Sequence, residues 1–127
     1  TMSEAASKYR GTKEYMLVYA ELVTAARYRG TLTYPDIGRA MGLKTFTGNH
    51  FSRVTGQILG EISEDEVRQG RPMLSAIAVS KTTHRPGDGF YEFARQLGRL
   101  KSEDPAAERA FWEAEVKAVY ETWAHES

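Results

Sequence analysis

The stretch TYPDIGRAMGLKTFTGNHFSRVTGQILGEI, residues 33 to 62, predicts two helices separated by a short turn. Pro35 suits the first turn of a helix over residues 33–43, which would have Thr33 or Tyr34 near its cap and end at Gly42. After the turn, apolar residues recur at helical spacing over residues 50–62 and share one side of a second helix: Phe51, Val54, Ile58 and Ile62. The spacing indicates a helix-turn-helix.

Sequence on either side adds two more helices. Residues 13–29 have a helical apolar face, and Gly30 follows as a natural helix stop. Asp104 and Pro105 predict the cap and first turn of a C-terminal helix that runs to about Ala124. Its apolar stripe, expected to pack on the core, consists of Trp112, Val116, Val119 and Trp123.

The segment between these helices contains the extended elements. Ser63 and Glu66 match a capping box, so the chain is expected to kink there and restart a short helical turn before Gly70. MLSAIAVS, residues 73–80, predicts a strand, followed by a polar loop and by FYEF as an extended or helix-starting piece.

Together these elements predict a mostly α fold with a small β hairpin. The order is that of a winged helix-turn-helix with additional N- and C-terminal helices. We expect residues 1–12 to be flexible and residues 13–127 to form a single domain that ends in an acidic helix over residues 103–124.

Composition limits the function classes. The chain has 127 residues, no cysteine and no apolar run long enough to span a membrane, and its polar N-terminus does not resemble a secretory signal. These features fit a cytoplasmic protein. Net charge is zero, but 15 basic and 10 acidic residues lie in residues 1–101, against 2 and 7 in residues 102–127. A mildly basic body is therefore followed by an acidic helix.

Three segments resemble one family in the right order. TYPDIGRAMGL is similar to the T-Y-G-E-I-A-x-x-x-G pattern of the alkylguanine-DNA alkyltransferases, and SRVTGQIL (52–59) to their A-R-A-V-G-x-A-L recognition helix. RPMLSAIAVSKTTHRPGDGFYEF (71–93) resembles the strand and wing that follow. The related alkyltransferase-like proteins share this winged-helix domain without the reactive cysteine. The resemblance covers about 60 residues, from 33 to 93.

The resemblance implies roles for four parts of the chain. Arg53 would enter the base stack where a nucleotide has been flipped out. Tyr34 would push on the neighbouring phosphate. Gly56 would allow a close approach of the recognition helix, and residues 81–89 would be the wing.

One departure from the family changes the expected activity. Its P-C-H-R-V active site falls where this chain has LSAIAV (74–79), with Ser75 or Ala76 nearest the cysteine position. Alkyl transfer needs a reactive thiolate, and a serine hydroxyl without a base does not replace it. We therefore expect a non-enzymatic protein with no cofactor and no metal. Ser75, His84 and Asp88 lack the sequence context of a catalytic triad.

The residue types themselves favour contact with double-stranded DNA. Small polar and basic side chains at the start of the second helix suit base edges, and those of the loop suit phosphates. The expected DNA-binding residues are Tyr34, which the resemblance implies, and Thr47, Asn49, His50, Ser52, Arg53, Lys81, Thr83, His84 and Arg85, on a recognition helix over about 47–60 and a wing over about 81–89.

The alternative is a winged helix used for protein–protein contact. The acidic C-terminal helix would bind the partner through Trp112 and Trp123, since aromatic side chains are enriched at interfaces. Such a protein would be a bacterial or phage regulatory or defence-related adaptor. The two hypotheses differ in whether Arg39, Lys44, Arg53, Lys81 and Arg85 share one face and whether the acidic helix crosses it.

Overall fold

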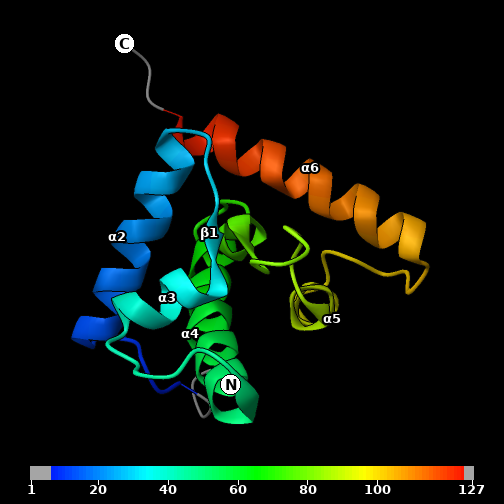
Figure 1. The fold of residues 1–127 in the computed structure, drawn as a ribbon. Helices are drawn as coiled ribbons and strands as arrows, with labels where there is room; N and C mark the ends of the chain where they lie inside the picture. The colour runs from blue at the N-terminus through cyan, green and yellow to red at the C-terminus, as the bar shows by residue number, and fades with distance from the viewer. Residues whose placement is uncertain (1–6, 125–127) are drawn as a thin grey trace.

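A computed structural model describes residues 7–124 and shows a mostly helical protein (Figure 1). Its elements in chain order are α2 (Lys13–Arg27), β1 (Leu32–Thr33), α3 (Tyr34–Ala40), α4 (Gly48–Arg68), the 3-10 helix η1 (Leu74–Ile77), β2 (Ala78–Val79), α5 (Asp88–Gln96) and α6 (Pro105–Trp123). The long helix α4 runs through the middle, while α6 crosses one end of the molecule (Figure 1).

The sheet differs from the expected hairpin. Strands β1 and β2 pair in parallel, with Leu32 opposite Ala78 and Thr33 opposite Val79. Residues 73–80 form a 3-10 turn and only two strand residues, and the segment after the loop is helix α5. The prediction of a β hairpin is therefore wrong, because the buried pair Phe90 and Ala94 has the four-residue spacing of a helix rather than the alternation of a strand. The coarser expectation, mostly α with a small sheet, is confirmed.

The start signals of two helices are confirmed. The Thr33 hydroxyl accepts a hydrogen bond from the Asp36 N–H at 3.2 Å, and the Asp36 carboxylate accepts one from the Thr33 N–H at 2.9 Å. This capping box starts α3, and the Thr33 N–H bond lowers the pKa of Asp36, with help from Arg39. At the other end of the chain, Asp104 accepts a hydrogen bond from the Ala107 N–H and caps α6.

Helix α4 has no break at Ser63, so the predicted capping box there is wrong. Ser63 and Glu66 lie in the interior of one continuous helix, and both are buried. The Ser63 hydroxyl bonds to Ser75 instead, and the Glu66 carboxylate binds the Arg71 guanidinium with two hydrogen bonds of 2.9 and 2.8 Å. Tertiary partners for these polar side chains thus replace the local cap that their spacing indicated.

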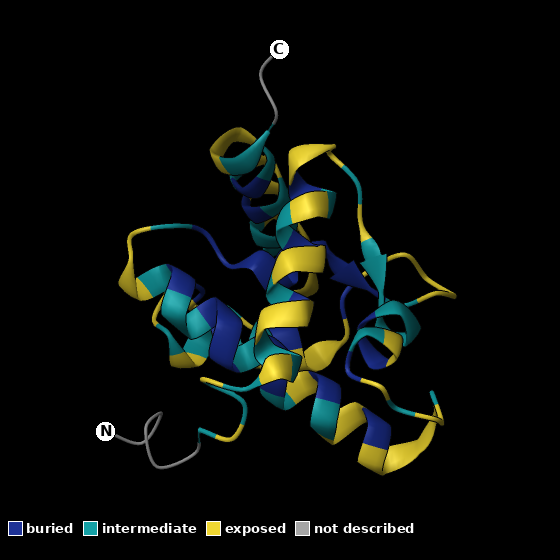
Figure 2. Cartoon of the chain, turned by 90° about the vertical axis from the view of Figure 1, so that its left-hand side faces the viewer, coloured by how far each residue is buried: buried dark blue, intermediate teal, exposed yellow. Residues whose placement is uncertain are grey.

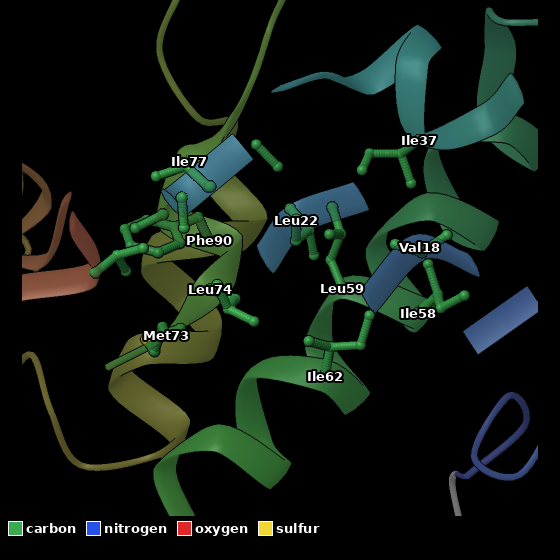
Figure 3. Close-up of a cluster of buried hydrophobic side chains, with 14 of the residues drawn as sticks. Val18, Leu22, Ile37, Ile58, Leu59, Ile62, Met73, Leu74, Ile77 and Phe90 are labelled. Carbon is green, nitrogen blue, oxygen red and sulfur yellow. The ribbon is translucent and has the colours of Figure 1, made fainter. Parts of the chain in front are cut away.

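The core lies where α2, α4 and the segment after α4 meet. Apolar side chains from all three converge there, with Ile37 of α3 and Phe90 of α5 at the edges (Figure 3). Ten of these side chains are labelled in the close-up: Val18, Leu22, Ile37, Ile58, Leu59, Ile62, Met73, Leu74, Ile77 and Phe90. The buried side chains of α2 and α4 follow helical spacing, as Figure 2 shows by alternating buried and exposed bands.

Residues 8 to 10 are fixed to α4, although the sequence predicted a flexible N-terminus. The buried Glu61 carboxylate accepts hydrogen bonds from the backbone N–H groups of Lys8, Tyr9 and Arg10, at 2.8 to 3.2 Å. The Arg10 guanidinium pairs with Glu64 at 2.6 Å and with Asp65 at 2.9 Å. The first half of the predicted flexible segment, residues 1–6, lies outside the described residues.

Replacing each of two helical glycines with alanine should change the free energy of unfolding in opposite directions. A Cβ on Gly38 would lie 2.8 Å from the Phe51 ring and 3.0 Å from the Phe46 ring, whereas a Cβ on Gly56 would meet nothing within 4 Å. Gly38→Ala should lower the free energy of unfolding by about 1 to 3 kcal/mol through overpacking. Gly56→Ala should raise it by roughly 0.5 to 1 kcal/mol through helix propensity. Urea denaturation of both variants tests this, and equal effects would contradict the close packing of α3.

Glu61 predicts a loss of stability in acid. Burial alone would raise its pKa, but hydrogen bonds from Gln57 and from the N–H groups of residues 8–10 lower the pKa on balance. A carboxylate whose pKa is lower in the folded state stabilises the protein above its unfolded pKa, near 4.5, and loses that effect as the pH falls through the folded value.

Glu61→Gln should therefore lower the free energy of unfolding by about 1 to 3 kcal/mol at pH 7 and by less near pH 3. Thermal denaturation from pH 3 to 7 measures the difference. Glu21→Gln, on the exposed side of α2, is the control and should leave the pH profile unchanged. A constant difference across the pH range would show that the charge of Glu61 does not hold the N-terminal segment.

Candidate nucleic-acid interface

The first two turns of α4 present polar side chains to solvent. Thr47 is the N-cap residue, but its side chain makes no cap hydrogen bond. Phe51 alone among the first residues is buried, where it packs edge-on against Phe46 with ring centroids 6.1 Å apart. That anchor points the opposite face outward, and the exposed residues are those predicted for DNA: Thr47, Asn49, His50, Ser52 and Arg53.

The loop from Ser80 to Gly87 is a closed turn rather than a β wing. The Ser80 N–H donates to the Arg85 carbonyl at 2.8 Å, and the His84 N–H donates to the Ser80 carbonyl at 2.9 Å. Thr83 accepts a hydrogen bond from the Arg85 N–H, and His84 closes the turn with a φ of 59°. The side chains predicted to contact phosphates are all exposed: Lys81, Thr83, His84 and Arg85.

Tyr34 joins the loop to the helix-turn-helix. Its hydroxyl accepts a hydrogen bond from the Gly87 N–H at 2.8 Å, across 53 residues of sequence. Burial raises the pKa of Tyr34, so its hydroxyl keeps its proton at neutral pH and has it to donate. The residue that sequence analysis assigned to a phosphate therefore also fixes the end of the loop.

Acidic residues are missing from the two stretches of sequence that contain the first turns of α4 and the 80–87 loop. Residues 37–60 and residues 67–87 contain no Asp or Glu, although the chain has 17 acidic residues. The basic residues do not all share one role: Arg39 pairs with Asp36 at 2.6 Å and stacks on the Phe46 ring, while Lys44 is exposed. Arg53, Lys81 and Arg85 are exposed and have no ion pair among residues 7–124.

A pocket of about 500 Å³ opens between α4 and α5, beside this surface. Ser52 and Gly56 of α4 line one side, and Tyr34 and Gly87 lie at the same pocket, so it adjoins both the first turns of α4 and the end of the loop. Its other lining residues are Phe51, Thr55, Leu59, Gly60, Ser75, Asp88, Gly89, Phe90, Glu92, Phe93 and Gln96. Gly56, which the resemblance assigned to a close approach of the recognition helix to DNA or to its neighbour, faces this open space.

The acidic helix α6 packs away from the start of α4. It lies on α2 and η1, at the opposite end of the molecule from the first turn of α4 (Figure 1). Both tryptophans contact the body: the Trp112 indole N–H donates to the Ala76 carbonyl at 2.8 Å, and Trp123 lies under the Arg71 guanidinium. The side chains on which the protein-partner hypothesis depends are thus used within the chain.

Sequence analysis assigned no pocket role to three polar residues that line the pocket, Ser75, Asp88 and Glu92. Ser75 was judged only as a possible nucleophile, yet it forms a buried pair with Ser63, in which the two hydroxyl oxygens lie 2.7 Å apart. Asp88 was assigned to the wing and Glu92 had no assigned role. The i, i+4 spacing of these two acids on one helix was the available signal.

Comparisons of the chain with protein-family models, with curated proteins and with solved structures each found no match. Residues 7–124 contain no group of three or more His, Asp or Glu that could hold a metal ion. In the same part of the chain, no helix is both long and apolar enough to cross a membrane. The resemblance to the alkyltransferases remains a prediction.

Tyr34→Phe should free the end of the loop. Removing the hydroxyl leaves the Gly87 N–H without its acceptor, so the free energy of unfolding should fall by about 0.5 to 1.5 kcal/mol and the Gly87 amide should exchange faster with solvent. The matched control is Tyr120→Phe, which deletes a 2.7 Å hydrogen bond to the Gly30 carbonyl and none to the loop. If both variants change Gly87 exchange equally, Tyr34 does not hold the loop.

Proposed function

We propose that this protein binds double-stranded DNA without catalysing a reaction, with the start of α4 as the recognition element and the 80–87 loop as a second, phosphate-contacting element. The observation that carries the proposal is that the first turns of α4 and the 80–87 loop expose basic and polar side chains and contain no acidic residue. Electrostatic attraction to phosphates supplies most of non-specific DNA affinity, and a surface without carboxylates avoids repulsion.

The proposed roles follow from side-chain chemistry. Asn49 can bond the edge of adenine, and Arg53 can bond guanine or a phosphate. Lys81 and Arg85 are exposed cationic side chains suited to phosphates. The remaining proposed contacts are polar hydrogen-bonding groups: Tyr34, Thr47, His50, Ser52, Thr83 and His84.

This arrangement supports a winged-helix-like use of the helix-turn-helix, in which the loop takes the place of a β wing. The location of α6 also supports it, because the acidic helix leaves the first turn of α4 uncovered. Damage recognition and alkyl transfer form no part of the proposal, since the position nearest the family's cysteine is Ser75 or Ala76.

Salt dependence of binding to a labelled DNA duplex tests the proposal. The wild-type affinity should fall steeply with salt, and Lys81→Ala with Arg85→Ala should lower the slope of log K against log salt by about two. Arg53→Ala should weaken binding by about 1 kcal/mol or more. The control double variant removes two basic residues from α6, Arg109→Ala with Lys117→Ala, and changes the net charge equally.

Two outcomes would contradict the proposal. The first is no binding at low salt. The second is an equal loss in the control variant, which would mean that net charge, and not this surface, attracts the DNA.

A further inference from the structure

The pocket between α4 and α5 differs in charge from the first turns of α4 and from the 80–87 loop. Its lining includes the carboxylates Asp88 and Glu92 and no Lys, Arg or His. Both acids are exposed at the pocket, and neither forms an ion pair with any residue of the described chain. Arg95, one turn along α5 from Glu92, interacts with that carboxylate electrostatically but forms its ion pair with Glu108. A phosphate would be repelled by the two acids, whereas a cation would find two carboxylates without an ion-pair partner.

Much of the remaining lining is aromatic. Four rings line the pocket, from Tyr34, Phe51, Phe90 and Phe93. Ammonium groups are attracted to the faces of aromatic rings, and sites that combine such rings with carboxylates recognise organic cations. The volume of about 500 Å³ is within the usual range for small-molecule sites.

A buried hydroxyl adds a hydrogen-bonding group to this lining. Ser75 is 93% buried, and its Oγ accepts a hydrogen bond from Ser63 while its own N–H donates to the Ser63 Oγ at 3.0 Å. This leaves the Ser75 hydroxyl proton for a group in the pocket. The Tyr34 hydroxyl, which accepts from Gly87, likewise has its proton to donate.

We propose that this pocket binds a small organic cation, an ammonium group attached to an apolar or aromatic body. The ammonium would lie between Asp88 and Glu92, and the body would pack on the phenylalanine rings, with Ser75 as a donor to a polar substituent. The proposal does not depend on DNA binding, because it concerns the charge and shape of the pocket alone.

Benzylammonium and benzyl alcohol form a matched pair of probes, equal in shape and different in charge. Glycine amides report on the site in ¹H–¹⁵N NMR spectra, since Gly56, Gly60, Gly87 and Gly89 line the pocket while Gly42 and Gly70 do not. We expect benzylammonium to shift the lining glycines with a dissociation constant of about 1 mM or tighter. Benzyl alcohol should bind about 3- to 30-fold more weakly.

Two variants test separately whether binding needs the carboxylates of the pocket and whether it needs the volume of the pocket. Asp88→Asn with Glu92→Gln should reduce benzylammonium binding to the level of benzyl alcohol, whereas the control Glu21→Gln with Glu103→Gln should not. Gly56→Leu should block both probes, because its side chain extends into the open space without a clash at Cβ. The spectrum of each variant shows whether the fold is kept.

Three results would overturn the proposal. They are equal affinity for the two probes, shifts confined to glycines outside the pocket, or no shift with either probe.

Discussion

The fold depends on the burial of a short segment, residues 72–79, which contains only the 3-10 helix η1 and the two-residue strand β2, in the middle of the molecule. Elements this short leave buried backbone groups that need other partners. The Met73 N–H donates to the Glu115 carboxylate at 2.9 Å, the Ser75 N–H donates to Ser63, and the Ala76 carbonyl accepts from Trp112. Helices α4 and α6 therefore supply the polar groups that this segment cannot find within itself, and its position fixes the loop and the pocket that follow.

Buried carboxylates organise the helices around that segment. Glu115 also holds the Arg99 guanidinium with two hydrogen bonds of 3.0 and 2.8 Å, and Glu66 holds Arg71 in the same bidentate way. A bidentate arginine satisfies both oxygens of a buried carboxylate, so its charge stays compensated. Removing either arginine would leave an uncompensated buried charge, which is more damaging than losing an exposed ion pair.

The sequence was informative where local physics determines the structure. The helix start near Thr33 and Pro35 and the Asp104–Pro105 helix start were predictable, because both are set by residues within one turn. The parallel pairing of β1 with β2 was not, since a two-residue strand has too little pattern to identify a partner 46 positions away. The prediction of a capping box at Ser63 and Glu66 was wrong because their spacing matches a helix cap, whereas their observed partners, Ser75 and Arg71, are set by tertiary packing.

In the candidate site too, features set by local sequence were predictable, and features set by tertiary packing were not. Exposed polar residues at the start of α4 were predictable from the apolar spacing that places Phe51 inside. The pocket was not predictable, because it is formed by Gly56 and Gly60 of α4 facing α5, and no local pattern shows which helix will lie opposite. Glycine inside a helix costs about 1 kcal/mol relative to alanine, so this open face lowers the intrinsic stability of α4. Helix α4 can accommodate that cost because Glu61, Ser63 and Glu66 in its second half bind the rest of the protein, and this leaves its first half free to present a surface and a cavity.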